Sequence, residues 1–292
     1  MQYQIINLGK YIYEISINLI MTVSLKAPDN SIRDILVQFL PYSINAINSL
    51  DNYRDRVKLY SSIKNHKESV GVLFMSGYNI HIWFSPTIWI FGNNETNNEI
   101  LEYFDTSDPS GKYVVQVTDK DENTLEPGLN YNIFREYMME LNKLNFHNYV
   151  NNISFPIKRL DKNDAIQSLL ISGFDSENKI EKRSIEMEER FISERETYGI
   201  FKDGKLICRG SIMSCNGKYC SVGGFVTHND FRNRGIGKFL VHYICGLVVS
   251  RHKIPILFMR DDNIPASKLY TGIGFEIKGN IYFMDHKTGA RP

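Results

Sequence analysis

The stretch Phe231-Arg232-Asn233-Arg234-Gly235-Ile236-Gly237-Lys238 lies between an apolar segment, 221–227, and a helical pattern that begins at Phe239. Glycines let the backbone approach a ligand closely, and the first N–H groups of a helix have no partner within that helix. The helix dipole also favours an anion at this end. Three basic side chains add positive charge. The sequence therefore predicts a phosphate-binding turn between a strand and a helix.

Two common phosphate motifs do not fit this turn. The dinucleotide fingerprint G-x-G-x-x-G needs a third glycine, but Leu240 stands at that position. A P-loop needs a hydroxyl residue after Gly-Lys, and Phe239 follows Lys238 instead. What remains is Arg-x-x-Gly-x-Gly, which resembles the acetyl-CoA pyrophosphate loop of the GNAT N-acetyltransferase superfamily. Taken alone, the turn could equally be the basic start of an ordinary surface helix.

A second segment strengthens the resemblance. Residues 263–276 read Asn-Ile-Pro-Ala-Ser-Lys-Leu-Tyr-Thr-Gly-Ile-Gly-Phe-Glu, which is similar to the GNAT segment Asn-x-x-Ala-x-x-Leu-Tyr-x-x-x-Gly-Phe. It follows an expected strand at 254–259, in the same order as in that superfamily. The resemblance covers 155–287. It implies an α/β (α+β) fold with a mixed, mostly antiparallel sheet and helices on both faces.

The chain divides in the sequence at a polar, Asn-rich stretch, 148–154. We expect an N-terminal α+β accessory domain at 1–150 and an acetyl-CoA-binding catalytic domain at 151–292. In the first domain we expect mainly helix at 4–66, strands at 70–75, 80–84, 88–91 and 113–117, and helices at 95–104 and 133–144. This order is similar to bacterial acetyltransferases whose N-terminal domain is a degenerate GNAT half, and an unrelated α+β domain is the alternative.

The composition is that of an ordinary soluble protein, with 42% hydrophobic and 23% charged residues and a net charge of +1. The charge gives no argument for a nucleic-acid partner, and the longest uncharged run of the second half is too short to span a bilayer. No signal peptide is evident, and the seven His residues show no metal-ligand spacing. The four cysteines form no C-x-x-C pair. We therefore expect a cytoplasmic protein with reduced cysteines, no metal and no membrane anchor.

The resemblance implies which residues hold acetyl-CoA. The N–H groups of the turn face the CoA pyrophosphate, and three residues of the preceding strand pair with the pantetheine arm as an added strand would. Arg232 contacts a carboxylate or a cofactor phosphate. The expected N–H donors are Arg234, Gly235, Ile236, Gly237 and Lys238, and the expected pantetheine partners are Phe225, Val226 and Thr227.

Catalytic residues are harder to assign. Tyr270 falls on the family position whose phenol protonates the CoA sulfur, although it could also be a core tyrosine. Asn263 matches a position that contacts the pantetheine, and it could equally be a helix N-cap. The strand before the turn has no carboxylate. His228 titrates in the useful range for a general base, but a surface histidine or a water chain explains the same pattern.

The sequence thus predicts an acetyl-CoA-dependent N-acetyltransferase that acts by direct attack of a primary amine in a ternary complex. A non-catalytic acyl-CoA sensor and an aminoacyl or longer-acyl transferase of related fold are the rival hypotheses. The sequence does not identify the acceptor amine or settle the oligomeric state, for which a homodimer is one option.

Overall fold

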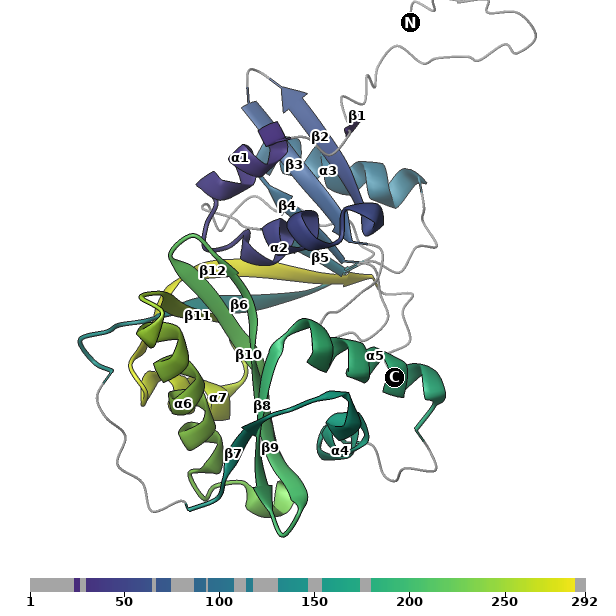
Figure 1. Ribbon diagram of the computed structural model, residues 1–292. Coiled ribbons are helices and arrows are strands. Elements are labelled where there is room, and N and C mark those ends of the chain that lie inside the picture. The colour runs from purple at the N-terminus through teal and green to yellow at the C-terminus, as the bar shows by residue number, and fades with distance from the viewer. Residues whose placement is uncertain are drawn as a thin grey trace, which may run out of the picture.

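The structure is a computed structural model with a mixed α/β fold whose sheet is mostly antiparallel. Helices lie on both faces of this sheet (Figure 1). This confirms the fold class expected from the sequence. The described residues are 24–26, 30–64, 67–74, 87–92, 94–107, 114–117, 131–146, 154–173 and 180–286.

In the second half of the chain, strands and helices follow the expected order. The first hairpin turns at Asp203 and Gly204, whose φ angles of 49° and 75° suit a tight turn between antiparallel strands. The elements are β7 (Ile157–Arg159), α4 (Ala165–Ile171), α5 (Lys182–Glu194), β8 (Glu196–Lys202), β9 (Lys205–Asn216), β10 (Tyr219–Thr227), α6 (Ile236–Ser250), β11 (Ile254–Arg260), α7 (Ile264–Thr271) and β12 (Phe275–His286).

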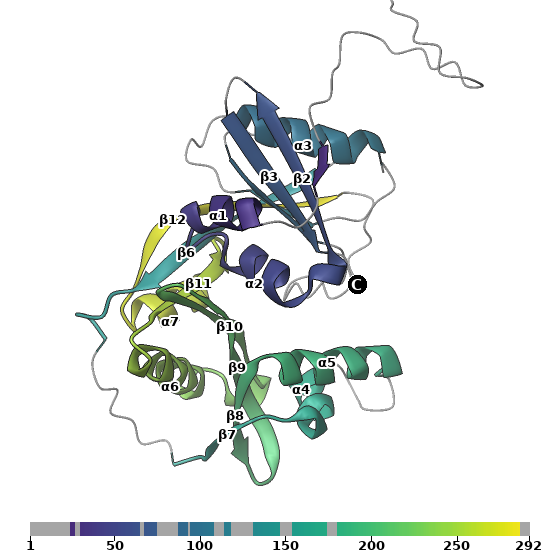
Figure 2. The same cartoon turned by 45° about the horizontal axis from the view of Figure 1, so that its top comes forward.

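The first half has a similar arrangement. Helices α1 and α2 pack on one face of its strands and α3 covers the other (Figure 2). The elements are β1 (Ser24–Lys26), α1 (Asn30–Gln38), α2 (Ile44–Asn52), β2 (Val57–Lys64), β3 (Lys67–Phe74), β4 (Thr87–Phe91), α3 (Asn94–Ser107), β5 (Val114–Val117) and β6 (Tyr131–Leu141).

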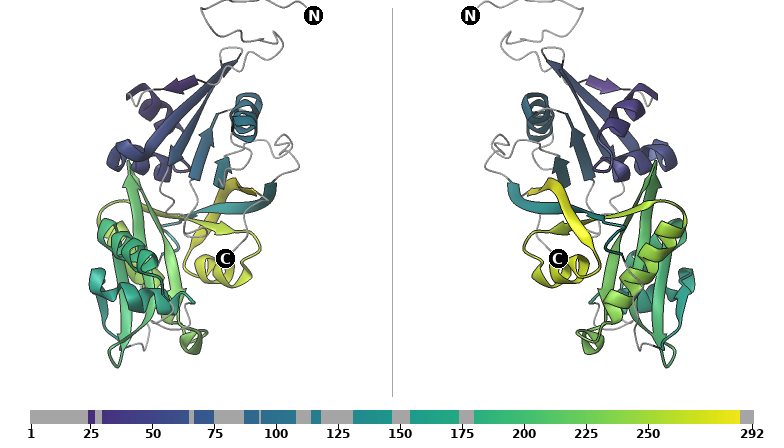
Figure 3. Two further views of the ribbon diagram at one scale, coloured as in Figure 1. Left: turned by 90° about the vertical axis from the view of Figure 1, so that its right-hand side faces the viewer. Right: turned by 90° about the vertical axis from the view of Figure 1, so that its left-hand side faces the viewer.

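The two halves exchange their last strands. The sheet order is β1-β2-β3-β4-β5-β12-β6-β11-β10-β9-β8-β7, so β12 completes the first half and β6 completes the second. Each half contains one parallel pair, β4–β5 and β10–β11, joined through a helix. Strands β6 and β12 pair along their length where the halves meet (Figure 3). The first half thus repeats the layout of the second, as expected for a degenerate GNAT half.

Separate apolar clusters stabilise the two halves. The larger one packs α6 against β8–β11, while α1 and α2 pack against β2–β4. A smaller cluster of Ile44, Met138 and Ile256 joins α2 to β6 and β11. Ser214 of β9 donates a hydrogen bond of 3.0 Å to Asn45 of α2. Helix α2 therefore belongs to the first half but lies against the sheet of the second.

Two sequence expectations were wrong in the first half. Residues 133–144, expected as a helix, lie mostly in strand β6, and 57–64, expected within a helical region, form β2. Strand β6 lies between β11 and β12, and apolar clusters cover both of its faces around Met138 and Met139, so its sequence lacks the alternation that marks a half-exposed strand. The helix at 95–104 and the strand at 113–117 were predicted closely, as α3 and β5.

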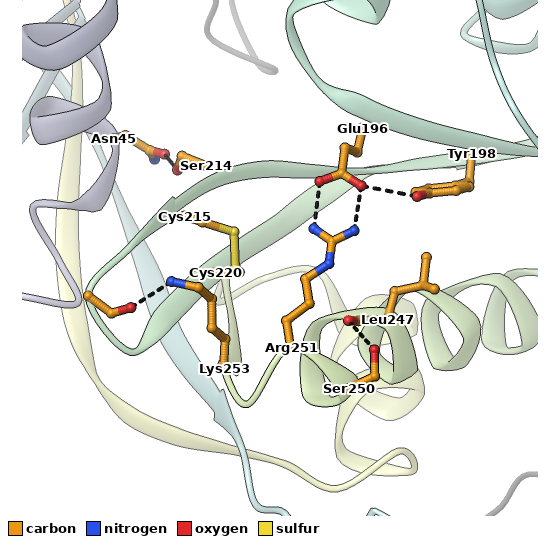
Figure 4. Close-up of a disulfide and its surroundings, with 11 residues drawn as sticks. Asn45, Glu196, Tyr198, Ser214, Cys215, Cys220, Leu247, Ser250, Arg251 and Lys253 are labelled. Atoms are coloured by element: carbon orange, nitrogen blue, oxygen red, sulfur yellow. Dashed lines mark hydrogen bonds and ion pairs between the residues drawn. A yellow bond between two sulfur atoms is a disulfide. The ribbon is translucent and has the colours of Figure 1, made fainter.

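The cysteines differ partly from expectation. Cys215 and Cys220 form a disulfide across the β9–β10 hairpin (Figure 4). Cys208 and Cys245 are free and buried. The hairpin turn at Asn216-Gly217 sets the register that places the first two opposite each other. Reduced cysteines were one argument for a cytoplasmic location, and that argument no longer holds for this pair.

Some expectations fall outside the described residues. These are the start of the chain before Ser24, the strand at 80–84 and most of the boundary at 148–154. Trp89 and Phe91 of β4 are described and are buried in the core of the first half. Among the described helices, none is long and apolar enough to cross a membrane.

Candidate functional site

Strands β10 and β11 separate after a short paired stretch. Their parallel ladder runs only from Tyr219–Ile254 to Ser221–Ile256, although β10 continues to Thr227 and β11 to Arg260. Beyond Ser221 the register between β10 and β9 shifts twice. A β-bulge bends its strand and increases the local twist. The bulges therefore turn β10 away from β11 and open the sheet.

Gly224 lies within the second shift, at a φ of +65° that L side chains rarely adopt. A Cβ at this position would also contact the Nη1 atom of Arg209 at 3.4 Å. The glycine pair at 223–224 thus permits this β-bulge.

A cavity of about 380 Å³ occupies the gap between β10 and β11. Its walls come from both halves of the chain, because α2 and β6 contribute as well as β9, β10, β11, α4 and α7. Most of its lining is β10 and β11 backbone and side chains. The lining residues used below are Asn45, Glu136, Ser172, Arg209, Phe225, Val226, Arg260, Asn263 and Tyr270.

The cavity connects the two faces of the sheet. Successive side chains of a strand point to opposite faces. Met259 belongs to the cluster around α6, against which Tyr270 also packs. Phe258, one residue earlier, packs in the cluster beneath α2, and Arg260 alternates onto that same face. Tyr270 and Arg260 therefore approach the gap from opposite sides.

The predicted phosphate turn precedes α6 at the end of β10. Gly235 is the N-cap residue, with a φ of +77°, and the segment from Arg232 to Gly235 is exposed. A Cβ at Gly237 would meet the Thr227 Oγ1 atom at 3.1 Å, which is tight. Gly235 thus allows a left-handed backbone conformation, and Gly237 allows the helix to approach the strand closely.

The basic residues of the turn differ in their contacts. Arg232 donates from Nε to the Thr227 carbonyl oxygen at 3.1 Å, so it anchors the turn to β10. The Arg234 guanidinium lies 5.6 Å from the Phe231 ring centroid. Ile236 is buried, and Lys238 is partly buried near the Gly272 position. The expected set thus lies together at one end of β10.

Tyr270 lies on α7 and lines the cavity. Its ring centroid is 6.2 Å from that of Phe225 and 5.9 Å from that of Phe275. Burial raises the pKa of its phenol above the ordinary 10.0. The phenol is therefore protonated at neutral pH and can donate a hydrogen bond in the cavity.

The other two candidates have different surroundings. The Asn263 side chain accepts a hydrogen bond of 3.2 Å from Ala266 N, so it is the N-cap of α7, and it also lines the cavity. His228 is 42% exposed, and its Nδ1 atom accepts from Asp230 N at 3.3 Å. It is not among the residues that line the cavity. The structure thus brings Asn263 together with Tyr270 but does not bring His228 there.

Glu136 was missed in the sequence. It is 2% exposed, lies on β6 opposite Arg260 of β11 and lines the cavity. Burial raises the pKa of its carboxyl to about 7, although the Arg260 guanidinium opposes this shift. Because 133–144 was expected to be a helix, the position of Glu136 in the sheet was not predicted. A carboxylate directly before the apolar run Tyr137-Met138-Met139 was the available signal.

A second buried charge, Arg209 of β9, lines the same cavity and is 4% exposed. Its Nη1 atom donates to the Gly224 carbonyl oxygen at 3.3 Å, and Nη2 donates to Ser172 Oγ at 3.1 Å. Glu188 of α5, fully buried, lies 3.6 Å from Nη2. Arg209 therefore ties the β10 bulge to helices α4 and α5.

Within the described part of the chain, no group of three or more His, Cys, Asp or Glu residues is placed to hold a metal ion. The polar side chains that line the cavity include a carboxyl, guanidinium groups, a phenol and amides.

Comparison with known proteins supports the fold. Residues 197–284 match the family described as FR47-like protein. A Drosophila protein of solved structure has a TM-score of 0.65 at 13% identity, over 92% of this chain and 99% of its own. No curated protein matches this chain in sequence.

Two further solved structures are similar over nearly the whole chain. A tandem GNAT protein from the clavulanic acid biosynthesis pathway has a TM-score of 0.59 at 12% identity, over 92% of this chain and 99% of its own. An acetyltransferase of the GNAT family from Colwellia psychrerythraea has a TM-score of 0.55 at 12% identity, over 91% and 99%. The chain therefore has the fold of two GNAT-like halves in tandem.

Proposed function

We propose that this chain, whose second half is an FR47-like domain of the GNAT fold, transfers an acetyl group from acetyl-CoA to a primary amine. The observation that carries the proposal is the gap between β10 and β11. At one end of β10 lies a glycine-rich basic turn, and the partly buried side chain of Tyr270 lines the cavity within the gap. This arrangement matches the needs of a thioester that enters along a strand edge.

Binding of the cosubstrate is assigned to the turn and the free edge of β10. The N–H groups from Arg234 to Lys238 would hold the pyrophosphate at the start of α6. Along Phe225–Thr227, the edge that faces away from β9 is not taken up by the β11 ladder. The pantetheine arm can therefore pair there as an added strand would. The close approach of Gly237 to Thr227 supports this fit, since a side chain there would crowd the same corner.

The chemical step needs a donor for the leaving sulfur. In the proposal Tyr270 supplies this proton, because its phenol stays protonated and lies in the cavity. Backbone N–H groups of the bulged β10 segment would stabilise the tetrahedral oxyanion. Attack is direct, in a ternary complex, since the two free cysteines are buried and neither lines the cavity.

A non-catalytic acyl-CoA sensor is the second candidate, because β10 itself carries no carboxylate. It would bind the same cosubstrate through the same turn without an amine-dependent step. An aminoacyl or longer-acyl transferase would instead need room for a larger acyl group. Titration with acetyl-CoA, CoA and a longer acyl-CoA, followed by CoA release with an amine panel, separates these functions.

The binding site is tested by reversing the charge of Arg234. Hydrogen bonds to charged groups contribute about 1.5–3 kcal/mol, so Arg234→Glu should weaken acetyl-CoA binding by about tenfold or more in calorimetric titration. Arg183→Glu is the control, because it makes the same change on exposed α5, across the sheet from α6. Equal affinities of both variants and the wild type would refute the assignment of the turn.

A further inference from the structure

An acyl transfer that uses a separate acid and base needs one group near the attacking nitrogen and another near the leaving sulfur. The amine attacks one face of the thioester carbonyl, while the sulfur leaves on another. In this fold Tyr270 approaches the gap from the face covered by α6 and α7. On the opposite face the cavity is lined by a carboxylate, Glu136, which the first half supplies through the exchanged strand β6.

From this geometry we infer that Glu136 is the general base that takes the proton from the acceptor amine. The inference rests on the proposed function and assigns the step that the sequence left open. It makes the first half of the chain part of the catalytic centre. The acceptor would enter from the side of α2, where Asn45 also lines the cavity.

The position of Glu136 follows from the register of β6. Glu136 pairs with Arg260, and two residues further Met138 pairs with Phe258. Met138 belongs to the cluster beneath α2, so Glu136 points to the same face. Tyr137, between them, packs in the cluster around α6 on the other face. The carboxylate therefore cannot be on the side of Tyr270.

Two arginines share the cavity with Glu136, and each is paired with an acidic side chain. Arg260 of β11 faces Glu136 and opposes the effect of burial on its pKa, and Arg260 is held by Asp262 at 3.1 and 2.5 Å. Arg209 of β9 lines the same cavity with Glu188 beside it.

The remaining groups on this face are weaker influences. Tyr42, before α2, has a phenol whose pKa burial raises, so it is neutral. Glu140 lies on the same face of β6, two residues beyond Met138, and its side chain is only partly buried. On β12 the register partner of Glu136 is the apolar Ile281. Burial is the main cause of the raised pKa of Glu136, about 7, and a base is most effective when its pKa lies near the working pH.

Other candidates for the base are less well placed. His228 is exposed and uses Nδ1 as the cap of a 3-10 turn. No carboxylate occurs in β10. Among the residues that line the cavity, Glu136 is the one acidic side chain.

The step balances as follows. The ammonium group of the acceptor gives one proton to the Glu136 carboxylate, and the neutral nitrogen then forms the C–N bond with its lone pair. The C–S bond breaks and its electron pair stays on the CoA sulfur, which takes a proton from Tyr270. The nitrogen loses its second proton, and exchange with solvent restores the Glu136 carboxylate and the Tyr270 phenol. The sum is amide, CoA thiol and one released proton.

The test compares Glu136→Gln with Glu140→Gln, which makes the same change on the same strand and face. Acetyl-CoA binding is first measured by calorimetry for each protein. CoA thiol release is then followed from pH 5.5 to 8.5 with a panel of alkylamines and with hydroxylamine, which is largely unprotonated at neutral pH. Glu136→Asp, which keeps a carboxylate, is measured in parallel.

We expect Glu136→Gln to bind acetyl-CoA like the wild type but to lose about 100-fold or more in kcat with alkylamines. Its rate with hydroxylamine should fall much less, and the acid limb near pH 7 should disappear. Glu136→Asp should keep an acid limb, and Glu140→Gln should behave as the wild type.

Two results would overturn the inference: a loss below tenfold, and an equal loss with both kinds of acceptor. If the wild type fails to bind acetyl-CoA, or binds it and releases no thiol with any amine of the panel, the proposed function itself is refuted.

Discussion

Replacing Glu136 by glutamine should change how the stability of the protein depends on pH. The pKa of Glu136 is raised to about 7 in the fold from an ordinary 4.5. Between these values the unfolded chain has lost the proton while the folded protein keeps it, so the free energy of unfolding falls as pH rises. The difference of about 2.5 in pKa, at 1.36 kcal/mol for each pH unit, corresponds to about 3 kcal/mol. Glutamine cannot ionise and removes this loss.

Urea unfolding followed by circular dichroism measures the effect. At pH 4.5 and below, Glu136→Gln and the wild type should have similar stabilities, because the native carboxyl is then protonated. At pH 8 the variant should be more stable by about 3 kcal/mol, with most of the change between pH 5 and 7. A difference between Glu136→Gln and the wild type that stays flat with pH would show that this carboxyl titrates like an exposed one, and the reasoning from burial would fail.

Two further predictions concern the other cavity residues. Tyr270→Phe should lower kcat by about 100-fold in the thiol-release assay and leave the calorimetric affinity for acetyl-CoA nearly unchanged, because only the proton donor is lost. The control is Tyr243→Phe, which makes the same change on the exposed side of α6. Equal rates for both variants would exclude Tyr270 as the donor. Arg209→Met should destabilise the fold by about 3–5 kcal/mol in urea unfolding, because it leaves the Glu188 carboxylate buried without its cation. Adding Glu188→Gln should recover a large part of that loss, and no recovery would show that Arg209 acts through packing alone.

Local signals explain what the sequence predicted well. The turn at 231–238 and the segment 263–276 each carry their own glycines, caps and apolar spacing, so their structures follow from neighbouring residues. The hairpins at Asp203-Gly204 and Asn216-Gly217 are equally local. The second of these even fixed the pairing of Cys215 with Cys220, since a two-residue turn after Asn216 sets the cross-strand register. That disulfide was predictable, and reading the cysteines only by motif missed it.

Non-local pairing explains what the sequence did not show. Strand β6 pairs with β11 and β12, which lie more than a hundred residues later in the chain. Both of its faces are covered, so apolar residues follow one another and imitate a helical spacing. Glu136 was overlooked for the same reason, because an acidic residue in an expected helix has no evident partner. Its role depends on Arg260 and Tyr270, and nothing near it in the sequence points to either.

Because β6 and β12 are exchanged, the first half of the chain is part of the sheet of the second half. An accessory domain that merely covered an acceptor pocket could be removed and leave a weaker enzyme. Here removal of the first half would take β6 from between β11 and β12, and with it Glu136, while α2 would no longer support the tip of β9. The first half lacks the glycine-rich turn at the start of its own helix α3, where Asn94-Glu95-Thr96 stand. The first half contributes to the cavity of the second half by supplying strand β6. The sheet around this cavity is therefore completed by a strand of the first half.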